Sequence, residues 1–233
     1  MRVRRAAAAV AAMLWLGGPA RAGEAAPRPV VAELFTSEGC SSCPPAEALL
    51  AELARNRPDL LVLAFHVTYW DQLGWRDPFG LPAATARQRD YATQLGLETV
   101  YTPQLVVNGS RDVIGSDRGA VLSALYAAAA TAAPPVPLAL QRLPGGARVA
   151  AGAGPGHGTL LLIGFDSLHR TPVARGENAG RVLLEANVVR AIIPVGAWHG
   201  AALQAEAALP QGEHLALLLQ APDGRILAAA VLP

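Results

Sequence analysis

The two cysteines of this chain lie close together, in the segment Cys40-Ser41-Ser42-Cys43. This spacing is typical of a redox-active dithiol, and a pair of thiolates also binds soft metal ions. The apolar run Pro29–Phe35 predicts a strand before the pair, and Pro44–Arg57 predicts a helix after it. A single pair at a strand-to-helix junction favours thiol chemistry, with an inert surface disulfide as the alternative.

The position of the pair predicts a different role for each sulfur. Unpaired N–H groups and the positive end of the dipole at a helix N-terminus stabilise a thiolate. We expect Cys40 to be exposed and to act as the nucleophile. Cys43, one turn further in, should be shielded and should resolve the mixed disulfide.

Glu33 is a carboxylate inside an otherwise apolar predicted strand, where an unpaired charge is costly. Beneath the dithiol, with a raised pKa, it could accept the proton of Cys43 during resolution. The alternative is a strand end that exposes Glu33 to water or to an arginine.

A second predicted strand, Leu60–Val67, carries His66 and leads into a loop rich in Trp, Gly and Pro. The loop leaves the carboxyl end of its strand, where α/β folds place their sites. We expect Trp70 and Trp75, with Phe79, to form an apolar lip for a peptide substrate. Packing in the core is the alternative for these aromatic residues, and a hydrogen-bonded structural role is the alternative for His66.

The order of elements predicts an α/β thioredoxin-like N-terminal domain followed by an all-β, sandwich-like C-terminal domain. Three prolines near residue 135 end an alanine-rich helix. The predicted division is a signal peptide over 1–22, the first domain over 23–133, a linker over 134–137 and the second domain over 138–233. The polar, glycine-bearing segment Arg175–Gly180 is predicted to be a solvated turn, with a partner-binding loop as the alternative.

Several motifs resemble a bacterial secreted thioredoxin-like family, domain of unknown function 1223. They are Glu33–Ala46, Phe65–Phe79, Thr85–Arg89, Val100–Gln104, Gly176–Arg181 and Asn187–Arg190. The resemblance covers nearly the whole mature chain and implies a fold and a compartment more directly than an activity.

In thioredoxin-like folds, a cis-proline precedes the strand beside the dithiol, and its neighbouring backbone pairs with the substrate chain. The resemblance therefore implies a cis Thr102–Pro103 bond that borders Cys40, with Thr102 contacting substrate. A trans proline that starts the strand Gln104–Asn108 is the alternative.

The N-terminus has the pattern of a secretory signal: Arg2, Arg4 and Arg5, an apolar run, and a small-residue cleavage site near Ala22. Cleavage would place the mature chain in the periplasm or outside the cell, with no transmembrane segment; a retained anchor is the alternative. The leader holds 4 of the 19 basic residues, so 15 remain against 18 acidic ones. This slightly acidic balance argues against a nucleic-acid partner.

The leading functional prediction is a thiol–disulfide oxidoreductase that acts on protein thiols and disulfides, or on a redox partner, without a cofactor. The first alternative is a Cu(I)-binding module or metallochaperone that uses Cys40, Cys43 and His66. The second is a binding protein in which the disulfide braces a loop.

Overall fold

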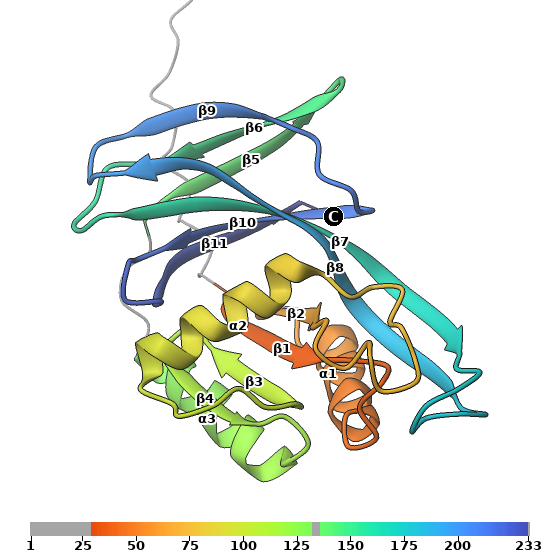
Figure 1. The fold of residues 1–233 in the computed structure, drawn as a ribbon. Helices are drawn as coiled ribbons and strands as arrows, with labels where there is room; N and C mark the ends of the chain where they lie inside the picture. Colours follow the sequence, from red (N-terminus) through yellow and green to blue (C-terminus); the bar gives the residue numbers. More distant parts are fainter. Residues whose placement is uncertain (1–28, 132–135, 233) are drawn as a thin grey trace, which may run out of the picture.

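The computed structural model describes residues 29–131 and 136–232, in which strands from both halves of the chain form one large mixed sheet (Figure 1). Its eight strands lie in the order β11 (Ile226–Leu232), β10 (His214–Gln220), β7 (Gly158–Pro172), β8 (Val182–Trp198), β2 (Leu60–His66), β1 (Val30–Thr36), β3 (Gln104–Val107) and β4 (Arg111–Ile114). A second sheet contains β5 (Leu138–Leu143), β6 (Gly146–Ala151) and β9 (Leu203–Ala208). The described helices are α1 (Pro44–Asn56), α2 (Pro82–Leu95) and α3 (Arg118–Ala130).

The predicted fold class, a thioredoxin-like α/β domain followed by a separate β-sandwich, is wrong. Strands dominate the structure, and β8 of the second half lies beside β2 of the first half in the same sheet. Val188 pairs with Ala64, and the side chain of Asn187 donates a hydrogen bond to the carbonyl of Val62 at 2.8 Å. Asn187, next to this pairing, has a φ of 51°, in the left-handed region that asparagine adopts more readily than most residues.

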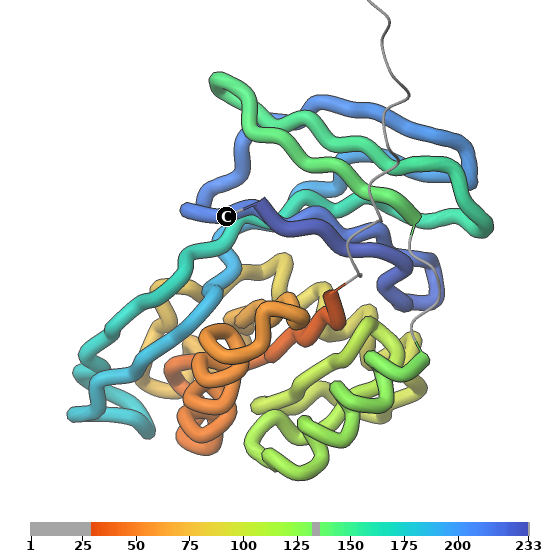
Figure 2. The backbone as a smooth tube through the Cα atoms, turned by 180° about the vertical axis from the view of Figure 1, so that it is seen from behind, coloured from red at the N-terminus to blue at the C-terminus, as the bar shows by residue number. Residues whose placement is uncertain are grey.

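The two faces of the β1–β2–β3 region are both apolar and are covered by different helices. On β1, Val31 and Phe35 belong to a core cluster with α2, while Ala32 and Leu34 belong to one with α1 and α3. Successive strand residues point to opposite faces, so residue parity determines which helix each side chain meets. Figure 2 shows α1 and α3 on the side opposite α2.

A third core cluster lies between the three-stranded sheet and the β7–β10–β11 region. Leucines 160, 162, 215, 217 and 219 alternate along β7 and β10 and contribute to it together with the buried Trp198. The indole N–H of Trp198 donates to the carbonyl of Gly152 at 3.0 Å, which satisfies its one donor in the core.

The strands β7 and β8 are long, at 15 and 17 residues. Beyond its pairing with β10, β7 continues with β8 as a two-stranded ribbon that ends at the loop 173–181 (Figure 1). The predicted signal peptide and half of the predicted linker, residues 134 and 135, lie outside the described residues.

Among the described residues, no helix has both the length and the apolar composition needed to cross a membrane.

Candidate functional site

Cys40 and Cys43 form a disulfide in the loop between β1 and α1, with their Cα atoms 5.4 Å apart. Cys43 is the N-cap residue of α1, and its carbonyl oxygen accepts hydrogen bonds from the N–H groups of Ala46 and Glu47. The backbone N–H of Cys43 donates to the carbonyl of Cys40 at 3.2 Å. The segment from Cys40 to Cys43, which the disulfide closes, therefore leads directly into the first helical turn.

The expectation that Cys40 is exposed is wrong, because both cysteines have an exposed fraction of 0%. The intervening Ser41 and Ser42 are exposed. The Ser42 hydroxyl lies 3.4 Å from the Cys40 sulfur. The backbone of this loop is also hydrogen-bonded to a second segment of the chain.

That segment is the loop 173–181 between β7 and β8. Asn178 is fully buried and donates its side-chain amide to the carbonyl oxygens of Glu38 and Cys40, both at 2.9 Å. The exposed Glu177 accepts a hydrogen bond from the backbone N–H of Ser41 at 3.1 Å. The prediction of a solvated turn is therefore wrong at Asn178, which links the ribbon to the dithiol loop.

The helix N-terminus offers the sulfurs fewer donors than its position suggests. Pro44 and Pro45 fill the first positions of α1 and carry no N–H group. The N–H of Ser41 is bound to Glu177, and the N–H of Cys40 donates to Ser37. The alignment of the helix dipole and the Ser42 hydroxyl remain to stabilise a Cys40 thiolate.

A cluster of buried ionisable side chains lies beside the disulfide, where the two halves of the chain meet. Its members come from the dithiol loop, α1, β2, the β2–α2 loop and β8: Glu38, Glu47, His66, Asp77 and Glu185. Asp77 accepts from His66 Nδ1 and from the N–H of Glu38, both at 2.8 Å. Sequence analysis missed every member except His66.

The surroundings raise the pKa values of four members of this buried cluster and lower that of Asp77. Burial would lower the pKa of His66, but the charge and hydrogen bond of Asp77 outweigh it and raise the pKa to about 9. Burial raises the pKa of Glu47 to about 7 and that of Glu185 to about 8. Burial also raises the pKa of Glu38, against the opposing hydrogen bond from Trp75.

Three buried polar atoms of the cluster have no hydrogen-bond partner among the described residues: Glu38 Oε1, His66 Nε2 and Glu185 Oε1. Because unpaired buried polar groups are costly, these three atoms are an unusual feature of the cluster's interior.

Glu33 does not lie beneath the dithiol. It shares the parity of Val31 and Phe35 and therefore faces α2, where Arg87 binds it through two hydrogen bonds of 2.7 and 2.8 Å. Arg87 also donates to Tyr91 at 2.8 Å and is almost completely buried. The alternative of an arginine partner for Glu33 is thus confirmed, in the core rather than at a strand end.

The Thr102–Pro103 bond is cis, as the resemblance implies. Thr102 accepts a hydrogen bond of 2.9 Å from the indole N–H of Trp70, and a side chain built at Gly39 would meet the Cβ of Trp70 at 3.2 Å. Trp70 therefore lies between the dithiol loop and Thr102. The contact of Thr102 with a substrate stays a prediction.

The other predicted aromatic residues have structural partners. Trp75 is partly buried, and its indole N–H donates to Glu38 Oε2 at 2.6 Å. Phe79 packs against His169, with ring centroids 4.4 Å apart, and beneath the Arg190 guanidinium. The binding of a substrate by Trp70 and Trp75 stays a prediction.

Within the described residues, no group of three or more His, Cys, Asp or Glu side chains is arranged to hold a metal ion. The Nδ1 atom of His66 is engaged by Asp77. The Cu(I) alternative, which requires Cys40, Cys43 and His66 together, gains no support from this arrangement.

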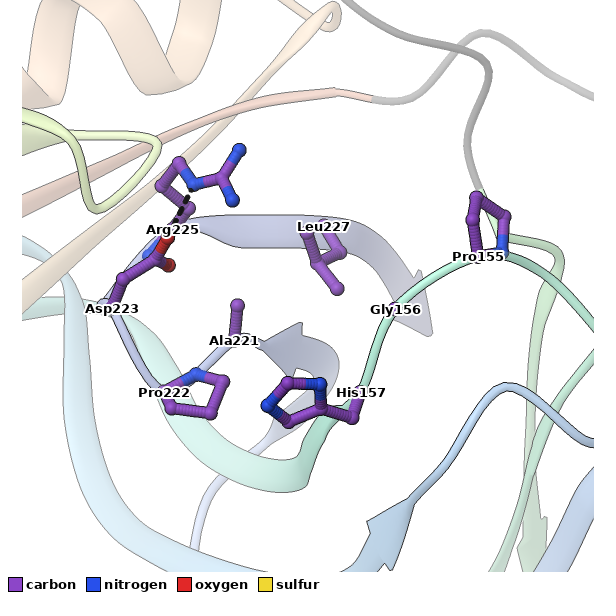
Figure 3. Close-up of a pocket in the computed structure, with 8 residues that line it drawn as sticks. All are labelled: Pro155, Gly156, His157, Ala221, Pro222, Asp223, Arg225 and Leu227. Carbon is purple, nitrogen blue, oxygen red and sulfur yellow. Dashed lines mark hydrogen bonds and ion pairs between the residues drawn. The ribbon is translucent and has the colours of Figure 1, made fainter.

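A hollow of about 430 Å³ lies away from the cysteine loop, beside the turn between β10 and β11 (Figure 3). His157 and Pro222 line it, together with Asp223 and Arg225, which form an ion pair of 2.8 Å. The charged groups in this hollow satisfy each other, and neither cysteine lines it.

The fold and site together define a mixed-sheet protein with a covered CxxC disulfide beside a buried acidic cluster. The chain belongs to the family described as protein of unknown function (DUF1223), whose model matches residues 31–220. A search among curated proteins found no match.

Two solved structures resemble this one. A crystal structure of a protein from Agrobacterium tumefaciens has 30% sequence identity, covers 87% of this chain and 93% of its own, and has a TM-score of 0.75. HBP35 of Porphyromonas gingivalis has 14% identity, covers 88% of this chain and 74% of its own, and has a TM-score of 0.60. The second similarity concerns the fold alone.

Proposed function

We propose that this protein is a thiol–disulfide oxidoreductase that exchanges disulfides with protein substrates through Cys40 and Cys43. The observation that supports this most directly is the position of its disulfide, which lies at the start of α1 beside buried groups that hold protons near neutral pH. Exchange needs a sulfur that accepts electrons and a nearby group that exchanges a proton with the departing thiolate. The disulfide and the buried carboxyl group of Glu47 lie in one loop and the helical turn that follows it.

The proposed exchange begins when a substrate thiolate attacks the sulfur of Cys40. The substrate–Cys40 bond forms, the Cys40–Cys43 bond breaks, and the electron pair leaves on Cys43. In the reverse direction, the Cys43 thiolate attacks the Cys40 sulfur of the mixed disulfide and releases the substrate thiolate. Cys40 is assigned as the attacked sulfur because its neighbour Ser42 is exposed, whereas Cys43 belongs to the helix.

Access to the disulfide requires a movement, since neither sulfur is exposed. Loop 173–181 covers the dithiol loop through the hydrogen bonds of Asn178 and Glu177. Each hydrogen bond contributes about 0.5–1.5 kcal/mol, so the loop can be displaced by a local opening that does not require global unfolding. Substrate binding in place of loop 173–181 would expose the Cys40 sulfur.

We further propose a periplasmic or extracellular location. A disulfide fits an oxidising compartment, and the N-terminal sequence has the pattern of a secretory signal.

The test measures thiol–disulfide exchange between glutathione and a fluorescent peptide disulfide, with native protein as catalyst. The proposal expects acceleration by the wild type and none by Cys40→Ser or Cys43→Ser. A disulfide that is reduced only after the protein unfolds, with no acceleration of exchange, would identify it as a structural brace and refute the proposal.

A further inference from the structure

We propose that Glu47 is the group that exchanges a proton with the Cys43 sulfur. This inference rests on the proposed function and assigns the role that sequence analysis gave to Glu33. The assignment follows from the helix geometry, the sheet faces and the partners of each carboxylate near the disulfide.

Helix geometry places Glu47 and Cys43 on the same side of α1. Cys43 has φ −80° and ψ −34°, which are helical values, and the N–H of Glu47 donates to the carbonyl of Cys43 at 3.1 Å. Residues four apart on a helix are neighbours, and long helical side chains point back toward the N-terminus. The carboxyl group of Glu47 is therefore directed toward the Cys43 end of the helix.

The sheet side of this space is polar and matches a carboxyl group. Thr36 is the last residue of β1 and has the parity of Ala32 and Leu34, so it faces α1. Its hydroxyl donates to Glu47 Oε1 at 2.6 Å. Thr36 pairs with His66 of β2, which places the imidazole on the same face.

The other carboxylates of the buried cluster have different hydrogen-bond partners, and none of them lies on α1. Asp77 binds His66 and two backbone N–H groups, those of Glu38 and Phe79. Glu38 accepts from the indole of Trp75 at 2.6 Å. Glu185 extends from β8 and accepts from Thr171 at 3.0 Å. Glu47 is the member that lies on the same helix face as Cys43.

The charge environment suits an exchangeable proton. Burial raises the pKa of Glu47 to about 7, against the positive charge of His66 and the hydrogen bond from Thr36. The negative charges of Asp77 and Glu38 act in the same direction as burial. Glu33 differs, because a buried guanidinium holds it as an ion pair on the opposite face.

The proton balance of the exchange is complete with this residue. When the Cys40–Cys43 bond breaks, the thiolate of Cys43 takes the proton of the Glu47 carboxylic acid and leaves a carboxylate. During resolution, that carboxylate removes the proton of the Cys43 thiol. The resulting thiolate then attacks the sulfur of Cys40 and releases the substrate thiolate.

The test is the rate of disulfide reduction by dithiothreitol between pH 5 and 9, divided by the thiolate fraction of the reagent. For the wild type, the normalised rate is expected to fall as pH rises through about 7, because the acid form of Glu47 is lost. Glu47→Gln should abolish this pH dependence and slow reduction about 10- to 100-fold at pH 6. Glu52→Gln, an exposed carboxylate on the same helix, should behave as the wild type.

Thr36→Val gives a second measurement that does not alter the carboxyl group itself. Loss of the Thr36 hydrogen bond should raise the pKa of Glu47, so the fall in rate should shift to higher pH. A wild-type pH profile retained by Glu47→Gln, or an unshifted profile for Thr36→Val, would overturn the assignment while leaving the exchange activity established. Absence of exchange by the wild type at every pH would refute the proposed function and this inference together.

Discussion

The side-chain amide of Asn178 donates a hydrogen bond to the carbonyl oxygen of Cys40 at 2.9 Å, across 138 residues of sequence. Through this contact, loop 173–181 at the tip of the β7–β8 ribbon covers the β1–α1 loop that carries the disulfide. The covering loop and the two cysteines come from opposite halves of the chain.

Asn178→Ala is expected to speed reduction of the folded protein's disulfide about tenfold, because two hydrogen bonds that hold the cover are lost. The rate of reduction by a small thiol, followed by gel shift after alkylation, measures this effect. Glu177→Gln is the matched control in the same loop. Its exposed contact contributes little, so its rate should stay within about twofold of the wild type. Equal rates for all three proteins would show that the loop does not control access.

The Cys40–Cys43 couple is expected to have a reducing potential, below about −200 mV. Two prolines remove N–H donors from the start of α1, and nearby carboxylates oppose a thiolate, so the reduced form gains little stabilisation. Pro45→Ala restores one N–H and should raise the potential measured by equilibration with glutathione. Pro82→Ala makes the same change at the start of α2 and should leave the potential unchanged. A wild-type potential near −120 mV would contradict this account.

Arg87→Met should destabilise the protein by about 3–5 kcal/mol, because it leaves the buried Glu33 carboxylate without its counter-ion. Arg118→Met removes an exposed pair with Glu52 and should leave the free energy of unfolding nearly unchanged. Urea unfolding followed by circular dichroism compares the two. Similar losses in both variants would contradict the ion pair on the α2 face.

Stability is expected to fall as pH rises from about 6 to 9. The folded-state pKa values of Glu185 and His66 are raised to about 8 and about 9, so the folded state retains protons that the unfolded chain releases. Their stabilising contribution is present at low pH and is lost as pH passes through these values. Glu185→Gln should flatten the decline in melting temperature over this range, while Glu206→Gln, an exposed control, should not. A wild-type melting temperature that rises between pH 6 and 9 would contradict the protonated cluster.

The sequence allows most strands and helices of the first half to be predicted, because apolar runs and Gly or Pro boundaries mark them. It does not show which strands lie side by side in the sheet. The run Leu60–Val67 looks the same whether or not another strand pairs beside it, so the β2–β8 contact was missed and the fold class was wrong. The hydrogen bond from Asn187 to the carbonyl of Val62 joins these two strands, and no local sequence pattern reveals it.

The site was predicted in part for the same reason. The spacing of Cys40 and Cys43 is local and is visible directly. Glu33 was misassigned because β1 is apolar on both faces, so its sequence does not indicate which face meets α1. Glu47 was overlooked because an acidic residue in the first helical turn usually complements the helix dipole at the surface. Here Thr36 and the packed sheet bury it.

The central claim is tested most directly with reduced Cys43→Ala protein and an oxidised cysteine peptide. Mass spectrometry of the folded protein should find the peptide attached at Cys40 as a lasting mixed disulfide, whereas the wild type should release it and recover its own disulfide. If the adduct forms only in denaturant, Cys40 takes no part in exchange in the native protein, and the proposed function is wrong.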